Sequence, residues 1–208
     1  MSSKDWVGNS NSIFKQLGAS SHTDEEREEN DFYATDPKAA HDLIACEPEI
    51  FTDKQVPIWE PACGLGHLSN VFLSLGYKVR TSDIINRTSG NDIEILDFLS
   101  LDQKCFEKWP GNIVTNPPYK FCTEFVLRAL DVIEEGKYVC MFLKLQTLEG
   151  YDRYQKLFKH NPPCRVHVYV KRIQCAKNGD FKGTSAVCYA WFVWKKGYKG
   201  DTIIKWII

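Results

Sequence analysis

The 208-residue sequence lacks the features that mark several protein classes. It contains no run of about 18 apolar residues, which is the length that a membrane-spanning helix requires. Its opening segment, MSSKDWVGNSNS, has no apolar core of the kind found in secretory signal peptides. No internal repeat or low-complexity tract is present. We therefore expect a cytoplasmic protein with no membrane partner.

Cysteine pairs with CxxC spacing are also absent, although the chain has eight cysteines. Evenly spread cysteines in a chain of this length without a secretory signal are typical of reduced, mostly buried thiols. Cys164, Cys175 and Cys188 could bind zinc together with His160 or His167, but the spacing matches no familiar ligand pattern. We expect these side chains to pack in the protein interior, and we assign no metal site.

Charge is unevenly distributed, although the formal net charge is only −1. Residues 1–50 contain 4 Lys/Arg and 11 Asp/Glu, whereas residues 144–208 contain 13 and 4, a balance of 13 − 4 = +9. A basic segment suits a polyanionic partner, and solvated surface lysines are the alternative. Since 43% of the residues are hydrophobic, the chain can bury a core. We expect residues 1–30 to be a flexible, polar and acidic segment and residues 31–208 to form one domain.

Strand-like and helix-like segments alternate along most of the chain. Extended segments are predicted at 56–60, 77–84, 94–98, 112–115 and 137–145, and helices at 37–46, 67–75, 121–134 and 151–159. This alternation predicts an α/β fold in which helices cover both faces of a mostly parallel sheet. Residues 165–170 and 186–194 read as two strands with no helix between them. They predict a C-terminal antiparallel pair at the edge of the sheet.

The glycine-containing segment Glu60-Pro-Ala-Cys-Gly-Leu-Gly66 joins the first of these strands to a helix. Glycines at such a junction allow a tight turn and a close approach of the backbone to a ligand. The third glycine of a dinucleotide-binding turn is missing, because Ser69 follows where it would stand. The turn therefore predicts a ligand that has no pyrophosphate.

Acidic residues end two further extended segments. Asp83 ends the second strand, where a carboxylate can accept hydrogen bonds from both ribose hydroxyls of a nucleoside; a helix or turn cap is the alternative. Asp97 could bond an exocyclic amine while Phe98 flanks an adenine ring, although Phe98 could equally pack in the core. Glu60 could face the ligand or bond the amides of its own loop. The acids at strand ends thus predict a nucleoside site.

Two prolines end the fourth strand in Ile113-Val-Thr-Asn-Pro-Pro-Tyr-Lys120. Proline donates no backbone hydrogen bond and fixes φ, so a pair of prolines ends a strand abruptly and locks the direction of the carbonyls. With proline at about 5% of residues, chance produces Asp/Asn/Ser-Pro-Pro-aromatic in about one such chain in a hundred or fewer. A second Asn-Pro-Pro, at 161–163, follows a helix and lacks the aromatic residue. We interpret the second copy as a helix stop.

These segments, in this order, resemble the S-adenosylmethionine-dependent amino-methyltransferases. Trp59-Glu-Pro-Ala-Cys-Gly-Leu-Gly66 is similar to the first cofactor motif of that family, with Cys63 where an aromatic residue often stands. Asp31-Phe-Tyr-Ala-Thr-Asp-Pro37 resembles the upstream motif that closes over the methionine end of the cofactor, and Asn116-Pro-Pro-Tyr119 is similar to the catalytic motif. Over residues 30–208 the chain looks most like small DNA N6-adenine methyltransferases of phage or prophage type.

The resemblance implies a class I, Rossmann-like methyltransferase domain that methylates N6 of adenine in DNA and uses S-adenosyl-L-methionine. The side-chain oxygen of Asn116 and the carbonyl of Pro117 would grip the target amine, Pro118 would rigidify the turn, and Tyr119 would stack on the base. Nucleic-acid contacts are expected at Lys120, Lys177 and Lys182. The implied cofactor-binding residues are Phe32, Tyr33, Pro37, Glu60, Pro61, Ala62, Gly64, Gly66, Asp83, Ile84, Asp97 and Phe98.

Other functions remain compatible with the sequence. The same motif could methylate cytosine N4, a base in RNA or a protein glutamine, because each presents a planar amino group, and the chain could also be a non-catalytic nucleic-acid-binding module. The protein-glutamine enzymes usually carry an N-terminal substrate domain, which 30 polar residues cannot form. A dedicated recognition domain is longer than anything between Tyr119 and Ile208. We therefore expect relaxed or short-site specificity, read by residues 146–160 and 173–186 or supplied by a partner.

Overall fold

The computed structural model describes residues 34–88, 93–101, 107–173, 175–176 and 187–208. The predictions for residues 1–30 and for Phe32, Tyr33, Lys177 and Lys182 lie outside this part of the chain. Among the described residues, no helix is both long and apolar enough to cross a membrane.

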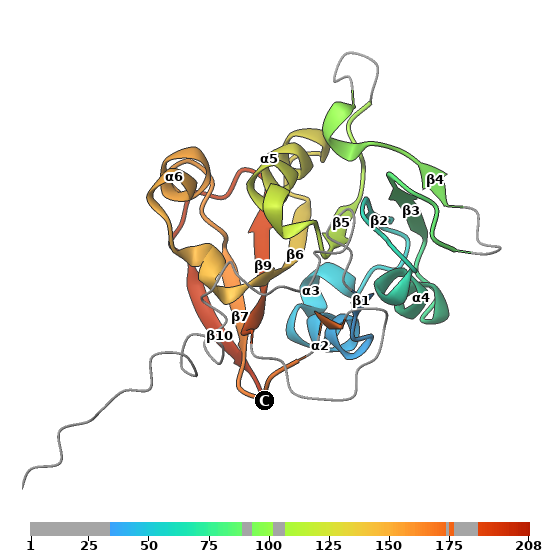
Figure 1. Cartoon of the computed structure of the whole chain (residues 1–208), viewed down its shortest axis with the longest axis horizontal. Helices are drawn as coiled ribbons and strands as arrows, with labels where there is room; N and C mark the ends of the chain where they lie inside the picture. The colour runs from blue at the N-terminus through green and yellow to red at the C-terminus, as the bar shows by residue number, and fades with distance from the viewer. Residues whose placement is uncertain (1–33, 89–92, 102–106, 174, 177–186) are drawn as a thin grey trace, which may run out of the picture.

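An eight-stranded sheet forms the centre of the molecule, in the order β10-β7-β9-β6-β5-β2-β3-β4 (Figure 1). Neighbouring strands are parallel except that β9 runs antiparallel to both β6 and β7. The predicted mostly parallel sheet is confirmed, and so is the antiparallel pairing of the segments at 165–170 and 186–194, which are β7 and β9. The strands are β2 (Ile58–Glu60), β3 (Val79–Asp83), β4 (Glu94–Ile95), β5 (Asn112–Thr115), β6 (Tyr138–Lys144), β7 (Arg165–Tyr169), β9 (Tyr189–Lys195) and β10 (Ile203–Ile207).

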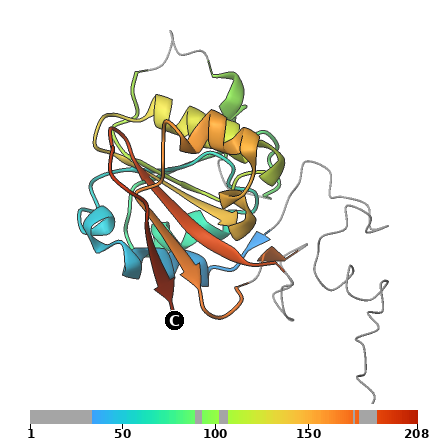
Figure 2. The ribbon, with the colours of Figure 1, turned by 90° about the vertical axis from the view of Figure 1, so that its left-hand side faces the viewer.

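Helices cover both faces of this sheet, as Figure 2 shows. On one face lie α2 (Lys38–Cys46), α3 (Pro48–Phe51) and α4 (His67–Ser74). On the other lie α5 (Cys122–Val132) and α6 (Tyr151–Arg153), which continues as a π-helical turn over Tyr154–Phe158. Short 3₁₀ turns occupy Phe98–Ser100, Tyr119–Phe121 and Leu145–Leu148. Because both faces are covered, the central strands are buried on both sides and read as continuous apolar runs.

Two helix ends follow the local sequence signals. The side chain of Asp36 accepts a hydrogen bond of 2.8 Å from the backbone N–H of Lys38, so it caps α2, which begins one residue later than predicted. At the second Asn-Pro-Pro segment, the N–H of Asn161 donates to the carbonyl of Leu157, and the chain then enters β7. The interpretation of this segment as a helix stop is confirmed.

Three strands were not predicted. The edge of the sheet is β10, so the antiparallel pair of β7 and β9 lies one strand inside the edge. In β10, Ile203, Ile204 and Trp206 are 52%, 49% and 66% exposed, so the strand has no alternation of buried and exposed residues that could identify it. The other two strands, β1 (Ala34–Thr35) and β8 (Cys175–Ala176), form a separate antiparallel pair from opposite ends of the sequence.

A buried ion pair ties the α2–α3 corner to the sheet. Glu47, between α2 and α3, is 1% exposed and accepts hydrogen bonds of 2.5 and 2.6 Å from the guanidinium of Arg165 on β7. His167 Nε2 lies 2.5 Å from the same carboxylate. Burial alone would raise the pKa of Glu47, but the hydrogen bonds from His167 and Arg165 outweigh it and hold the pKa below its usual value. The corner is therefore held by charge as well as by packing.

We predict that Glu47→Gln lowers the free energy of unfolding by about 3 kcal/mol at pH 7, because it leaves the Arg165 charge without its buried partner. The pKa of Glu47 is lower in the folded protein than its usual value of 4.5, which applies to the unfolded chain. The stability that this difference gives is fully present above pH 4.5 and is lost as the pH falls through the pKa of the folded protein. Urea titrations at pH 7 and pH 4 measure both effects.

Lys38→Gln is the matched control, because it breaks the pair of Lys38 with Asp42 from its exposed side: the Lys38 side chain is 60% exposed. Such a pair contributes about 1 kcal/mol or less. Equal losses of stability in the two variants would contradict the role assigned to Glu47.

Candidate active site

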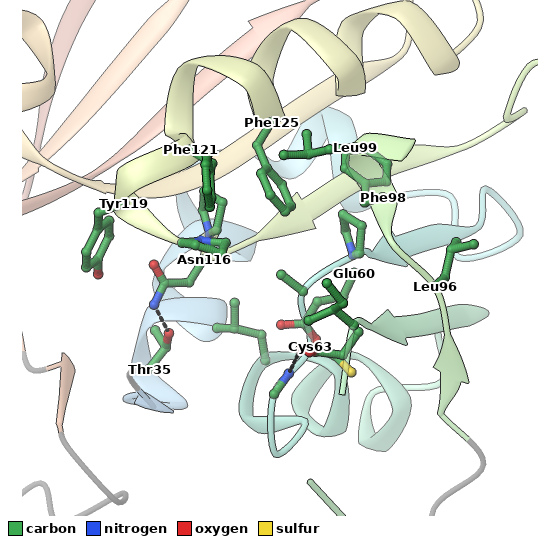
Figure 3. A pocket seen from close by; sticks show the side chains of 18 of the residues that line it. Thr35, Glu60, Cys63, Leu96, Phe98, Leu99, Asn116, Tyr119, Phe121 and Phe125 are labelled. Atoms are coloured by element: carbon green, nitrogen blue, oxygen red, sulfur yellow. Dashed lines mark hydrogen bonds between the residues drawn. The ribbon is translucent and has the colours of Figure 1, made fainter. Parts of the chain in front are cut away.

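A cavity of about 620 Å³ opens at the carboxyl ends of β2, β3 and β5 (Figure 3). This size is typical of small-molecule and cofactor sites, and the carboxyl ends of parallel strands are where open α/β sheets bind ligands. Strand β2 ends in Glu60, β3 ends in Asp83, and Asn116 follows β5. Parallel pairing of these strands brings all three polar side chains to the same cavity.

Most of the residues predicted for the site line this cavity. Those that do so are Glu60, Pro61, Ala62, Gly64, Asp83, Ile84, Asp97, Phe98, Asn116, Pro117, Pro118, Tyr119 and Lys120. Pro37 and Gly66 do not line it: Pro37 precedes α2, and Gly66 directs the chain into α4. The structure thus brings the glycine turn, the strand-end acids and the Asn-Pro-Pro-Tyr segment together.

The glycine turn depends on backbone conformations that favour glycine. Gly64 has φ 54° and Gly66 has φ 78°, both in the left-handed region that side chains disfavour. The N–H of Gly64 donates a hydrogen bond of 2.8 Å to Asp83 Oδ2, and the N–H of Cys63 donates to the carbonyl of Ser82. These two hydrogen bonds fix the turn to the end of β3. Gly64 forms part of the cavity wall.

Glu60 faces the cavity and also holds the first turn of α4. The residue is 4% exposed, and its carboxyl group accepts a hydrogen bond of 2.9 Å from the N–H of Ser69 in α4. Burial raises the pKa of Glu60 to about 8, and repulsion from Asp83 adds to this, while the bonds from Ser69 act against it. At neutral pH Glu60 therefore holds its proton, and the amide-bonding role considered for it is present in the structure.

Asp83 and Asp97 are both engaged by their own loops. Asp83 Oδ1 accepts hydrogen bonds from the N–H of Ile85 at 3.1 Å and from Arg87 at 3.0 Å. Asp97 caps the 3₁₀ turn that follows it, accepting from the N–H of Leu99 and from the Ser100 hydroxyl. The turn-capping role considered as an alternative for Asp83 is thus present, whereas the cap formed by Asp97 was not predicted. Both side chains still line the cavity.

Phe98 belongs to the core and forms a wall of the cavity at the same time. It is 2% exposed, and its ring meets Trp59 edge-on with the centroids 5.2 Å apart. Phe125 of α5 packs on it at 5.3 Å, and Leu96 and Leu99 extend the apolar wall (Figure 3). A planar ring could lie against this wall, since apolar lining with a few polar groups is typical of such pockets.

The Asn-Pro-Pro-Tyr segment is held by residues from distant parts of the chain. Asn116 Nδ2 donates a hydrogen bond of 2.8 Å to the hydroxyl of Thr35 on β1 (Figure 3). The hydroxyl of Tyr119 lies 3.3 Å from Cys175 Sγ on β8, and Lys144 Nζ lies 4.7 Å from the centre of the Tyr119 ring. Burial raises the pKa of Tyr119 well above its usual value, so its hydroxyl remains protonated.

Sequence reasoning missed several residues of the site. Cys175 contacts Asn116 and Tyr119. The lining residues that were not predicted are Ala34, Thr35, Cys63, His67, Leu68, Arg87, Leu96, Leu99, Phe121 and Phe125. Phe121 could have been found, since an aromatic residue two positions after Tyr119 follows the same turn. Thr35 lay inside a motif that was recognised, but its hydroxyl was assigned no role. Cys175 carried no local signal, because only the pairing of β1 with β8 places it there.

The cysteines do not form a metal site in the part of the chain that the structure describes. No three His, Cys, Asp or Glu side chains lie close enough there to hold a metal ion. Cys164 is buried and donates to the carbonyl of Val193, while Cys188 is exposed. Burial, followed by repulsion from Glu60 and Asp83, raises the pKa of Cys63 to about 12. This thiol is thus protonated at neutral pH and packs beside the glycine turn.

No protein-family model matches the sequence, and no curated protein matches it. Solved structures do match. One, from Listeria monocytogenes and provisionally described as a class I S-adenosylmethionine-dependent methyltransferase, is 12% identical with a TM-score of 0.57, covering 94% of this chain and 71% of its own. Another, from Pyrococcus horikoshii and provisionally described as an RNA methyltransferase, is 15% identical with a TM-score of 0.60, covering 89% and 98%.

A third match is the methyltransferase subunit of a type I restriction-modification system from Streptococcus thermophilus. It is 13% identical with a TM-score of 0.60, and the alignment covers 84% of this chain and 47% of the subunit. At these identities the likeness establishes the fold alone, which is the Rossmann-like fold of class I methyltransferases. The predicted fold class is therefore confirmed.

We predict that Glu60→Gln makes stability less dependent on pH. The folded protein keeps the proton of Glu60 up to about pH 8, whereas the unfolded chain releases it near the usual pKa of 4.5. Between these values the unfolded state binds fewer protons, so the free energy of unfolding falls as pH rises, by up to about 1.4 kcal/mol per pH unit. Urea titrations between pH 5 and 8 should show a flatter slope and higher stability at pH 8 for Glu60→Gln.

Glu124→Gln serves as the control, because Glu124 is an exposed residue in the first turn of α5. Its slope should match that of the wild type. If Glu60→Gln also matched the wild type, Glu60 would have to be ionised in the folded protein.

Proposed function

We propose that the protein transfers a methyl group from S-adenosyl-L-methionine to the exocyclic N6 amine of adenine in DNA. The observation that carries this proposal is the placement of Asn116-Pro-Pro-Tyr119 after β5, in the same cavity as the glycine turn and Asp83. The same cavity thus contains hydrogen-bond acceptors for an amino group, in the Asn116 segment, and a candidate nucleoside site beside Asp83. The class I methyltransferase fold supports the same proposal, because ligands of such open α/β sheets bind at the carboxyl ends of the strands, where both of these sites lie.

The residues of the cavity fit the cofactor. Asp83 Oδ2 accepts one hydrogen bond from Gly64, which leaves capacity for a ribose hydroxyl. Phe98 and Leu99 give a wall for the adenine ring, and the Gly64 turn lets the cofactor approach the backbone. When bound, S-adenosylmethionine supplies an activated methyl group on a sulfonium, so no nucleophilic side chain is required.

Asn116 and Pro117 are assigned to the target amine. The lone pair of an aryl amine is delocalised into the ring, so the nitrogen is a poor nucleophile. The side-chain oxygen of Asn116 and the carbonyl of Pro117 would accept the two N–H bonds and favour a pyramidal nitrogen. The N–CH₃ bond would form as the S–CH₃ bond breaks, which leaves the sulfur as a neutral thioether, and the amine would release one proton to solvent. Holding the reactants in line can lower the barrier by about 7–11 kcal/mol.

A nucleic acid is favoured as the substrate by the surroundings of the cavity. Phe121, which is 42% exposed, and Lys120 lie at the cavity directly after Tyr119, where a base that has left its stack could be contacted. Residues 144–208 carry the excess of 9 basic residues noted above. An adenine in RNA is the second possible substrate, since the Pyrococcus structure that covers 89% of this chain is provisionally described as an RNA methyltransferase.

Incubation with cofactor labelled in its methyl group, followed by digestion and mass spectrometry, tests the reaction. With unmethylated DNA we expect label in N6-methyl-2′-deoxyadenosine for the wild type and at least a hundredfold less for Asn116→Ala, which loses one acceptor for the amine. The matched control is Asn161→Ala, which alters the other Asn-Pro-Pro segment and should retain activity. Label in another nucleoside, or only in RNA, would change the substrate, and equal labelling by Asn116→Ala would refute the catalytic assignment.

The proposed specificity is relaxed or limited to a short site. Within the described part of the chain, the residues after Tyr119 form the remainder of the sheet and its helices and no separate recognition domain. Mapping of the methylated adenines by sequencing should therefore show many sequence contexts that share two to four base pairs at most, on the order expected for few base contacts. A single strict site of six or more base pairs would contradict this proposal.

A further inference from the structure

Asparagine at the catalytic position creates an ambiguity that aspartate would not. The amide of Asn116 has an oxygen that accepts hydrogen bonds and an NH₂ group that only donates them. A half-turn about the Cβ–Cγ bond would exchange the two and would present N–H donors to an amine that is itself a donor. The two oxygens of an aspartate are equivalent, so its half-turn changes nothing. A catalytic asparagine therefore needs neighbours that fix its orientation.

Two such neighbours contact the NH₂ end of Asn116. The hydroxyl of Thr35 accepts from Nδ2 at 2.8 Å, and the sulfur of Cys175 lies 3.7 Å from the same nitrogen. Thr35 is on β1 and Cys175 on β8, and the two residues are direct partners in the antiparallel pair that these strands form. An NH₂ group has two hydrogens, so one acceptor is available for each.

We propose that Thr35 and Cys175 are positioning residues that bind the two N–H groups of Asn116 and so hold its oxygen toward the target amine. This inference rests on the proposed function, because it assigns a role within that reaction. Figure 3 shows the geometry: the nitrogen of Asn116 points to Thr35, and the oxygen is at the opposite end of the amide. Thr35 is 4% exposed, so water does not compete effectively for its hydroxyl.

The thiol of Cys175 also holds the second side chain of the segment. It lies 3.3 Å from the hydroxyl of Tyr119, so one sulfur joins the amide to the phenol. Burial raises the pKa of Cys175 to about 11, and the thiol stays neutral at physiological pH. A neutral thiol can donate one hydrogen bond and accept others, whereas a thiolate would attract the cationic cofactor and perturb the site.

The orientation can be measured without any substrate. In the ¹⁵N-correlated NMR spectrum, the side-chain NH₂ signals of Asn116 are identified by their absence in Asn116→Asp. We expect slow hydrogen exchange of both protons in the wild type and in Thr35→Ser, which keeps the hydroxyl. Thr35→Val keeps the shape of threonine and removes the acceptor, so at least one proton should exchange about tenfold faster or more, as one lost hydrogen bond implies. Unchanged exchange in Thr35→Val would overturn the proposal.

Turnover supplies the second test, with Thr35→Val and Thr35→Ser compared in two backgrounds. With Asn116 present, we expect Thr35→Val to lower kcat by about tenfold to a hundredfold while Thr35→Ser largely restores it. In the Asn116→Asp background, the Thr35→Val substitution should change kcat by about twofold or less, because aspartate needs no orientation. Equal losses in both backgrounds would show that Thr35 supports packing only, and would overturn the proposal.

Cys175→Ala provides the same measurements if Thr35→Val does not fold, as judged from its thermal unfolding. It should accelerate exchange of the other Asn116 proton and lower kcat more in the asparagine background than in the aspartate background, where only its contact with Tyr119 is lost. Failure of the proposed function is a separate outcome. A wild type that methylates neither DNA nor RNA would refute that function, whereas the NMR measurement would still decide whether Thr35 and Cys175 orient the amide.

Discussion

The parallel pairing of β2 with β3 on one side and β5 on the other is the constraint on which the site depends. Backbone hydrogen bonds fix the relative register of these three strands, so their carboxyl ends meet at one edge of the sheet. Glu60, Asp83 and Asn116 are far apart in the sequence and close together in the fold for this reason alone. The turns that follow the strands then need only short segments to build the cavity: the glycine turn, the Asp97 cap and the two prolines after Asn116.

A second set of interactions holds Thr35 and α2 in place beside the site. Thr35 lies three residues before the start of α2. This helix is fixed to the sheet by the hydrogen bond from the Trp191 indole to the carbonyl of Ala39, and at its C-terminal end by the ion pair of Glu47 with Arg165. These contacts lie on the face of the sheet that α2, α3 and α4 cover. The position of the Thr35 hydroxyl beside Asn116 thus depends on packing and charge that lie outside the cavity. Stability and the geometry of the site are coupled through this short helix.

Burial raises the pKa values of several groups of the site and, for Glu60, changes the charge state near neutral pH. The pKa values of Glu60, Cys63, Tyr119 and Cys175 are all raised, each chiefly by loss of solvent, so these groups hold their protons near neutral pH. The ion pair of Asp83 with Arg87 is the charged contact among the described residues of the wall. In the proposed reaction the target amine must itself be neutral, since a protonated nitrogen has no lone pair with which to attack the methyl group. Catalysis in such a site would come from orientation rather than from acid or base chemistry.

Local patterns in the sequence were sufficient to predict the α/β fold, the order of the main elements and most segments that line the cavity. These features depend on local signals: the period of apolar residues, glycines at positive φ after β2, and prolines after β5. Tertiary structure alone decided the position of β10, whose exposed residues carry no period, and the pairing of Thr35 with Cys175 across 140 positions of sequence (175 − 35). Such contacts arise from the packing of distant elements, which leaves no trace in the neighbouring sequence.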